Sequence, residues 1–188
     1  RPTGIEVRTI NKVVVDNFYT YGGDLTLTFA RNRNLHVSNS TSLEQTHYCA
    51  EFASDCDIVT VSDCFFDSSE SNQNVSCTGT GRYFFNNVSI RGGIGNDETL
   101  LVAQNGNKVF LSNCYLEPTT NQTDAIHVIN GASLYINNTE FYTENAGAGW
   151  FIVIATATNP YVSIKGSTFE GSAYGPIDGS GVVTKLRV

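Results

Sequence analysis

The sequence predicts an all-β solenoid of about seven coils, with 24 to 28 residues in each coil. Apolar and polar residues alternate in short segments along the whole chain, and an Asn or Asp follows most of these segments. Charged residues make up only 15% of the chain, and Gly, Asn, Ser and Thr take their place. Alternation with a period of two is typical of strands, and this composition favours strands and turns over helices. The 188 residues suffice for one domain with a substantial core.

One segment shows the repeating unit. In LYINNTEFY, residues 134–142, the apolar Leu134 and Ile136 are followed by Asn138 and then by the apolar Phe141. Equivalent segments place the second apolar position, the anchor, at intervals of 24, 24, 24, 26, 25 and 28 residues. The predicted anchors are Val13, Val37, Val61, Phe85, Leu111, Ile136 and Ile164. Seven copies at a nearly fixed period indicate a repeat architecture.

The position two residues before each anchor supports this register. It is apolar in six of seven copies, the exception being Asn11 in the first copy. A step of two residues keeps both side chains on one face of a strand, so each coil turns an apolar pair inward. Stacked at ~4.8 Å per coil, the six steps between anchors would span roughly 30 Å.

Between the repeated segments lie further apolar runs, of which residues 149–157, GWFIVIATA, form the longest. These runs are bounded by turn residues, so each coil has two or three short strands and no room for a crossover helix. A β-sandwich would also contain many short strands, but it does not require a constant period. The solenoid is therefore the favoured interpretation.

An Asn or Asp recurs at the same point of five coils, just after the anchor. Asn tolerates left-handed backbone angles, and its amide can bond the next side chain of a stack. The predicted turn ladder consists of Asn39, Asp63, Asn87, Asn113 and Asn138, with Val15 and Gly166 interrupting it at the ends.

These anchor columns and this ladder resemble the right-handed parallel β-helix proteins of the pectate-lyase-like superfamily, over about residues 11–170. The resemblance implies a right-handed parallel β-helix and says little about function. Residues 1–10 and 171–188 are expected to cap the coils or join them to a neighbour.

Pectin-degrading hydrolases of this superfamily carry a paired Asp motif, a Gly-His-Gly and an Arg-x-Lys, and none of these is present. The histidines His36, His47 and His127 are expected to point outward from a strand or to be hydrogen-bonded within a wall of the solenoid. No catalytic, cofactor-binding or metal-ligating residue is predicted.

Two sets of charged residues are candidates for binding. Asp67, Arg91 and Glu117 should stack six residues past their anchors, and an ion-pair ladder is favoured over a glycan-binding patch. Acids in the loops would suit Ca²⁺, although solvated carboxylates are favoured and no cofactor is expected. These loop acids are Glu70, Asp97, Glu98, Asp124, Glu144 and Asp178.

The five cysteines form no CxxC pair. Cys64 and Cys114 fall two coils apart, about 9.6 Å, which is too far for a disulfide, so both are expected to be buried thiols. Cys49, Cys56 and Cys77 are the disulfide candidates, with one pair among them.

Five N-x-[ST] sequons occur in a chain so rich in Asn, Ser and Thr that about four would arise by chance. Asn74 and Asn121, in predicted loops, are the glycosylation candidates.

A net charge of −7 argues against a nucleic-acid partner, and no apolar run approaches the ~20 residues of a membrane helix.

We expect a non-catalytic structural or adhesive protein at a cell or virion surface, as a subunit or module of a filament, sheath or envelope layer. Its start at Arg1, without a Met, would fit either removal of a secretion signal or a fragment of a longer chain. Self-association is expected, with polysaccharide as a further partner. The alternative is a tailspike-like β-helix that binds or cleaves glycans, in whose groove Tyr19, Tyr115, Tyr142 and Tyr174 would serve.

Overall fold

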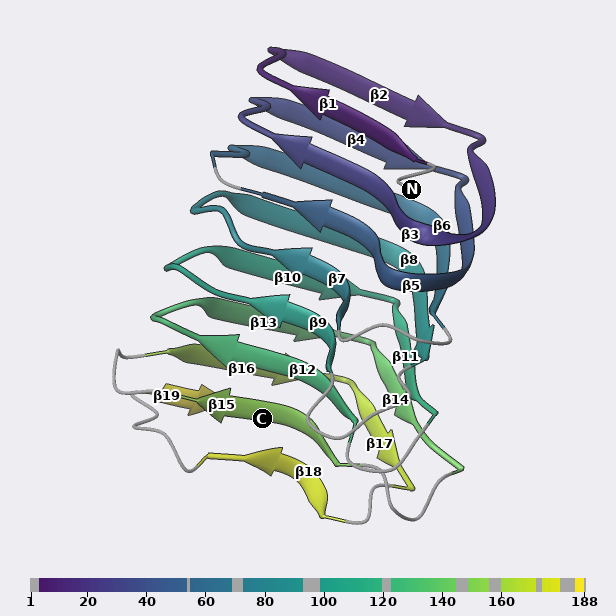
Figure 1. Ribbon diagram of the computed structural model, residues 1–188. Coiled ribbons are helices and arrows are strands. Elements are labelled where there is room, and N and C mark those ends of the chain that lie inside the picture. Colours follow the sequence, from purple (N-terminus) through teal and green to yellow (C-terminus); the bar gives the residue numbers. More distant parts are fainter. Residues whose placement is uncertain are drawn as a thin grey trace.

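The computed structural model describes residues 4–53, 55–68, 73–92, 99–119, 123–144, 149–155, 160–171, 174–179 and 185–187. The regular elements in these ranges are strands, and they wind into a parallel β-solenoid (Figure 1). The solenoid has about six turns, slightly fewer than the seven that the sequence predicts. Within the same ranges, no helix has the length and hydrophobicity needed to cross a membrane.

Each coil contributes to three faces of one continuous sheet, and long strands bend from one face to the next. Face 1 contains β1 (Ile5–Arg8), the ends of β3 (Tyr19–Ala30) and β5 (Thr41–Phe52), β7 (Gln73–Cys77), β9 (Thr99–Ala103), β12 (Asp124–Ile129), β15 (Trp150–Ala155) and β18 (Gly175–Asp178). Face 2 contains β2 (Lys12–Asp16), β4 (Asn34–Ser38), the first halves of β6 (Ile58–Ser68) and β8 (Arg82–Gly92), β10 (Lys108–Ser112), β13 (Ser133–Asn137), β16 (Tyr161–Lys165) and β19 (Lys185–Arg187). Face 3 contains the beginnings of β3 and β5, the second halves of β6 and β8, β11 (Tyr115–Pro118), β14 (Glu140–Tyr142) and β17 (Thr168–Glu170).

The strand register on face 2 follows the sequence period from the second coil onward. The anchors from Val37 to Ile164 pair with one another in parallel, coil after coil. The first coil differs, because Val15 pairs with Val37 and Val13 pairs with Leu35. The predicted anchor Val13 is therefore shifted by two residues. With this correction, the position two residues before the anchor is apolar in the first coil as well.

The turn between faces 2 and 3 uses a left-handed residue in each coil. The five predicted ladder residues have φ between 47° and 54°, and Asn17 (φ 56°) and Gly166 (φ 62°) extend the series at its two ends. A Cβ on Gly166 would lie 2.5 Å from Oδ1 of Asn138, so glycine fits this end of the stack. Since left-handed angles strain most residues, Asn, Asp and Gly at this position let the chain turn sharply once per coil.

Hydrogen bonds connect these turns from coil to coil. Asn87 Nδ2 donates to Oδ1 of Asp63 (2.8 Å), as expected for neighbours in a ladder. Asn113 instead donates to Oδ1 of Asn86 (3.2 Å). Asn39 Nδ2 donates to Oδ1 of Asp16 (3.0 Å), and this bond helps to lower the pKa of that carboxyl, after the larger effect of the Ser38 hydroxyl. The ladder residues thus bond both to one another and to the residue that precedes the ladder position in the neighbouring coil.

In the five coils from Ser40 to Thr139 the residue after the turn is buried and smaller than Leu, whereas the first coil has Phe18 at this position. The Ser40 hydroxyl donates to the Ser38 carbonyl (2.7 Å), and the Cys64 and Cys114 thiols lie 3.1 and 3.4 Å from the equivalent carbonyls two residues earlier. Val88 pairs with Cys64 in the same column. Both cysteines are buried and free, as predicted.

The core is formed by the inward columns of all three faces. Phe29 and Phe52 stack from face 1 with their ring centroids 5.9 Å apart, and Phe52 also contacts Tyr83 and Phe85 of face 2. On face 3, Phe141 packs between neighbouring aromatic rings of the last coils. Each fully buried side chain of this size contributes ~1.5–3 kcal/mol, so the stacked columns are the main source of stability.

The terminal segments continue the coils. β1 pairs in parallel with β3, and β18 and β19 pair with β15 and β16. The coiled part therefore extends beyond residues 11–170, and the described portions of 1–10 and 171–188 add strands to faces 1 and 2.

We predict that Asn138→Ala lowers the free energy of unfolding by about 1 kcal/mol, because alanine in a left-handed conformation is strained. Asn138→Gly is the matched control, since glycine adopts this conformation without strain. Urea denaturation followed by circular dichroism measures both variants. An equal loss in both would show that the left-handed constraint is not the cause.

Candidate functional site

The outer surface of face 2 carries a column of stacked aromatic rings. β8, β10 and β13 alternate buried and partly exposed residues, so that Phe84, Phe110 and Tyr135 point outward. They are paired residue for residue on adjacent strands. Register alone therefore brings three aromatic side chains from distant parts of the sequence into one column.

The rings form a continuous stack, which we name the aromatic ladder: Phe84, Phe110, Tyr135 and Tyr161. Centroids are 4.7 Å apart for Phe84 and Phe110 and 4.6 Å for Phe110 and Tyr135, with interplanar angles of 8° and 9°. Tyr161 lies diagonally from Tyr135 at 5.2 Å and is tilted by 43°. Since stacked rings cover one another's faces, Phe84, Phe110 and Tyr135 turn their ring edges toward solvent.

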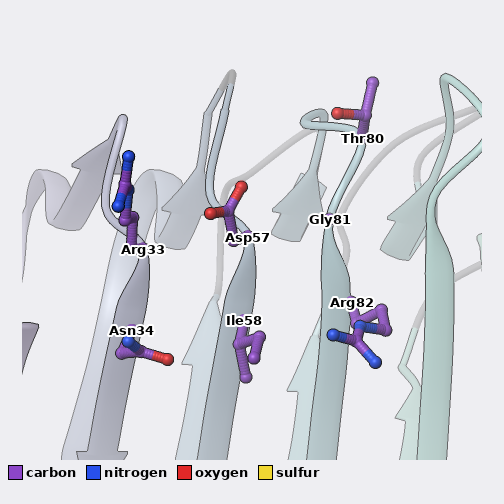
Figure 2. A pocket seen from close by; sticks show the side chains of 7 residues that line it. All are labelled: Arg33, Asn34, Asp57, Ile58, Thr80, Gly81 and Arg82. Carbon is purple, nitrogen blue, oxygen red and sulfur yellow. The ribbon is translucent and has the colours of Figure 1, made fainter. Parts of the chain in front are cut away.

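Beside the ladder, face 2 is hollowed where the side chains become smaller. The outward columns carry Asn34, Ile58, His36 and Thr60 in β4 and β6, in place of the long or aromatic side chains of β8 and β10. A hollow of about 410 Å³ is lined by Arg33, Asn34, Asp57, Ile58, Thr80, Gly81 and Arg82. Figure 2 shows Asn34, Ile58 and Arg82 side by side at the starts of three adjacent strands, below Arg33, Asp57 and Thr80 at the turns.

A smaller hollow of about 130 Å³ adjoins the first one. It is lined by Lys12, Val13, Asn34, Leu35, His36, Ile58 and Thr60. Because both hollows include Asn34 and Ile58, they form one depression, which we name the face-2 groove. Gly81 is needed at its margin, since a Cβ there would collide with the carbonyl oxygen of Cys56.

Positive charge surrounds this groove. Lys12, Arg33 and Arg82 line it, and Lys108 follows Arg82 in the next coil. Asp57 is the only carboxylate among the lining residues. The groove and the ladder together offer cations, hydrogen-bonding groups and aromatic surface along one face, without a pair of carboxylates.

The predicted charged column lies on face 3. Asp67, Arg91 and Glu117 are in register there, and Arg91 Nε lies 3.5 Å from Oε2 of Glu117. Tyr115 donates its hydroxyl to the same Oε2 (3.2 Å), and desolvation, aided by Glu117, raises the pKa of Tyr115 to about 12. Arg91 and Glu117 are thus engaged with each other, which favours the ion-pair interpretation for this part of the column.

The four tyrosines considered for a groove do not share one face. Tyr19, Tyr115 and Tyr142 lie on face 3, whereas Tyr174 stacks on Trp150 beside face 1, with centroids 6.1 Å apart. They do not form a joint aromatic site.

Two of the histidines can be placed with their side chains, and that of His47 lies outside the described residues. His36 lines the smaller hollow. His127 on face 1 lies 2.7 Å from Oδ2 of Asp124, whose Oδ1 accepts the backbone N–H of Trp150 (2.6 Å). Asp124 thus fixes both its own strand and the next one.

The loop acids are not gathered into a calcium site within the described ranges. Glu70, Asp97 and Glu98 fall outside those ranges. Asp124 contacts His127 and the backbone of Trp150, and Glu144 accepts a hydrogen bond from the Tyr142 hydroxyl (3.3 Å). Across the same ranges, no group of three or more His, Cys, Asp or Glu side chains is arranged to hold a metal ion.

The disulfide candidates Cys49, Cys56 and Cys77 are all buried free thiols, so the expected pair is not formed. Burial raises the pKa of Cys49 to about 12 and also raises those of Cys56 and Cys77. High thiol pKa values and burial make all three unreactive.

Of the glycosylation candidates, Asn121 lies outside the described residues. Asn74 is 1% exposed, and its Nδ2 donates to the carbonyl of Arg91 (2.5 Å). A buried amide bonded in this way leaves no room for a glycan, so Asn74 is a structural residue of the corner.

Sequence reasoning missed the aromatic ladder, although the signal was present. Phe84, Phe110 and Tyr135 each stand immediately before an anchor, at the outward position of the same strand. Reading that position as a column would have shown the three rings together.

Comparisons with protein-family models, with curated proteins and with solved structures returned no significant match. The functional proposal therefore rests on the arrangement of this chain's own side chains.

We predict that none of the five thiols reacts rapidly with a thiol reagent such as DTNB in the native protein, because all are buried. Alkylation in denaturant without reductant should then label all five, as mass spectrometry can show. A protein that carries only three labels would contain a disulfide, and this would contradict the arrangement described.

Proposed function

We propose that the protein is a non-catalytic adhesive module of an extracellular or virion-surface structure, which binds an extended polysaccharide along face 2. The observation that carries this proposal is the outward aromatic ladder, which runs from coil to coil and begins at Phe84, the strand neighbour of the groove residue Thr60. The apolar surface of a sugar ring packs against the solvent-facing edges of these stacked rings, while its hydroxyl groups bond to neighbouring polar residues.

The fold suits a polymeric ligand. Equivalent side chains recur about every 4.8 Å along the solenoid, so the ladder and groove extend in a line across consecutive coils. Stacking and parallel pairing hold these side chains in fixed positions before any ligand arrives. A preordered surface lowers the entropy lost on binding.

The absence of paired carboxylates among the groove-lining residues supports binding without cleavage. Glycoside hydrolysis commonly uses two carboxyl groups that flank the scissile bond, and Asp57 stands alone among these residues. This observation favours an adhesive role over the alternative of a depolymerising tailspike.

An extracellular location stays a proposal, and the state of the cysteines is compatible with it. All five thiols are buried and have raised pKa values, so they are shielded from oxidants.

Self-association also stays a prediction. The apolar surface of the first coil is consistent with it, since Ile10, Val14, Tyr19 and Tyr21 are 48–64% exposed.

We predict that Phe110→Ala weakens polysaccharide binding about tenfold, because it removes the ring between Phe84 and Tyr135. Affinity electrophoresis through gels containing hyaluronan or dextran measures the binding. Phe65→Ala is the matched control, as Phe65 is also partly exposed but points outward from face 3. Equal retention of both variants and the parent protein in every gel would contradict a role for the ladder.

A further inference from the structure

Two like charges stand directly opposite each other on face 2. Arg82 and Lys108 are paired residues on the adjacent strands β8 and β10, and both are exposed. Like charges in this position destabilise a sheet by themselves. Their column continues with Ile58 on one side and Ser133 on the other, so no carboxylate alternates with them.

Among the described residues, neither Arg82 nor Lys108 forms an ion pair, whereas Arg91 on face 3 lies next to Glu117. Arg33 and Lys12 add two more cations along the groove, against the one carboxylate of Asp57. The whole chain has a net charge of −7, so this local excess of positive charge is opposite in sign to the rest of the molecule.

The cations lie next to the ladder. Arg82 and Phe84 occupy alternate positions of β8, and Lys108 and Phe110 do so in β10, so each cation shares an outward face with a ring. Ring edges carry the positive part of the aromatic quadrupole. Cation and ring edge therefore both favour a ligand that is negatively charged and extends along the column.

We propose that the polysaccharide bound on face 2 is acidic, with its sugar carboxylates held by Arg82 and Lys108 and its rings along Phe84 and Phe110. This inference deepens the proposed function and rests on it. A guanidinium can bind a carboxylate through two parallel hydrogen bonds, and the ammonium of Lys108 adds a point charge one coil away. An incoming carboxylate also relieves the repulsion between the two cations.

A nucleic acid would bring negative charge too, but it carries a phosphate about every 3.4 Å of each strand, so the acidic remainder of the molecule repels it more strongly than a glycan with more widely spaced carboxylates. A local basic strip in an acidic protein is better matched to carboxylates spaced along a glycan chain.

The test compares three polymers: hyaluronan, which is carboxylated; dextran, which is neutral; and single-stranded poly-dT. Affinity electrophoresis at low and raised ionic strength measures retention of the full chain. We expect hyaluronan to be bound most tightly, with retention falling as salt screens the charges.

Lys108→Gln and Arg82→Gln should each weaken hyaluronan binding about tenfold, as expected for loss of a charged hydrogen bond. Lys165→Gln is the matched control, because Lys165 is also exposed but lies at the opposite edge of face 2. Lys108→Glu should abolish retention, and circular dichroism verifies that each variant is folded.

The outcomes separate this inference from the function on which it rests. Equal retention by hyaluronan and dextran, unaffected by Lys108→Gln, overturns the acidic specificity and leaves the glycan-binding function standing. Tighter retention by poly-dT overturns the choice of a glycan. Retention by none of the three polymers overturns both proposals.

Discussion

The left-handed turn between faces 2 and 3 is the constraint on which the rest of the structure depends. It must occur once per coil at the same point, and the series from Asn17 to Gly166 supplies a residue that tolerates it every time. A sharp turn at a fixed position keeps successive coils in register. Register then places apolar residues above apolar residues and closes the core.

The same register determines the surface. On face 2 it aligns Phe84, Phe110 and Tyr135 into a stack and brings Arg82 opposite Lys108. On face 3 it brings Arg91 next to Glu117, where the charges compensate each other. The two faces of the solenoid thus differ in how their charged side chains are arranged. On face 3 Arg91 has a carboxylate partner in Glu117, whereas on face 2 the cations Arg82 and Lys108 lie beside aromatic rings, an arrangement that an anionic ligand would complete.

Much of the fold could be predicted from the sequence, because stacked coils of similar length place equivalent residues at a nearly constant spacing along the chain. The first coil was misaligned by two residues for a physical reason. Val13 and Val15 are both apolar, and a slip of two residues leaves the same side chains facing inward, so the hydrophobic pattern cannot detect it. Asn17 was the better guide, since the turn requires a left-handed residue.

Burial at the corners could not be predicted from local sequence. Asn74 looked like an exposed sequon, but packing under the carbonyl of Arg91 depends on residues from another part of the coil. The face-2 groove depends on side-chain size along columns, which become neighbours only after the coils stack.

The most direct test of this account is an NMR titration of ¹⁵N-labelled protein with a short hyaluronan oligosaccharide. The account predicts that shift changes concentrate on face 2, around Arg82, Phe84, Lys108 and Phe110. Changes concentrated on face 3 around Arg91 and Tyr115, or no saturable change at all, would contradict it.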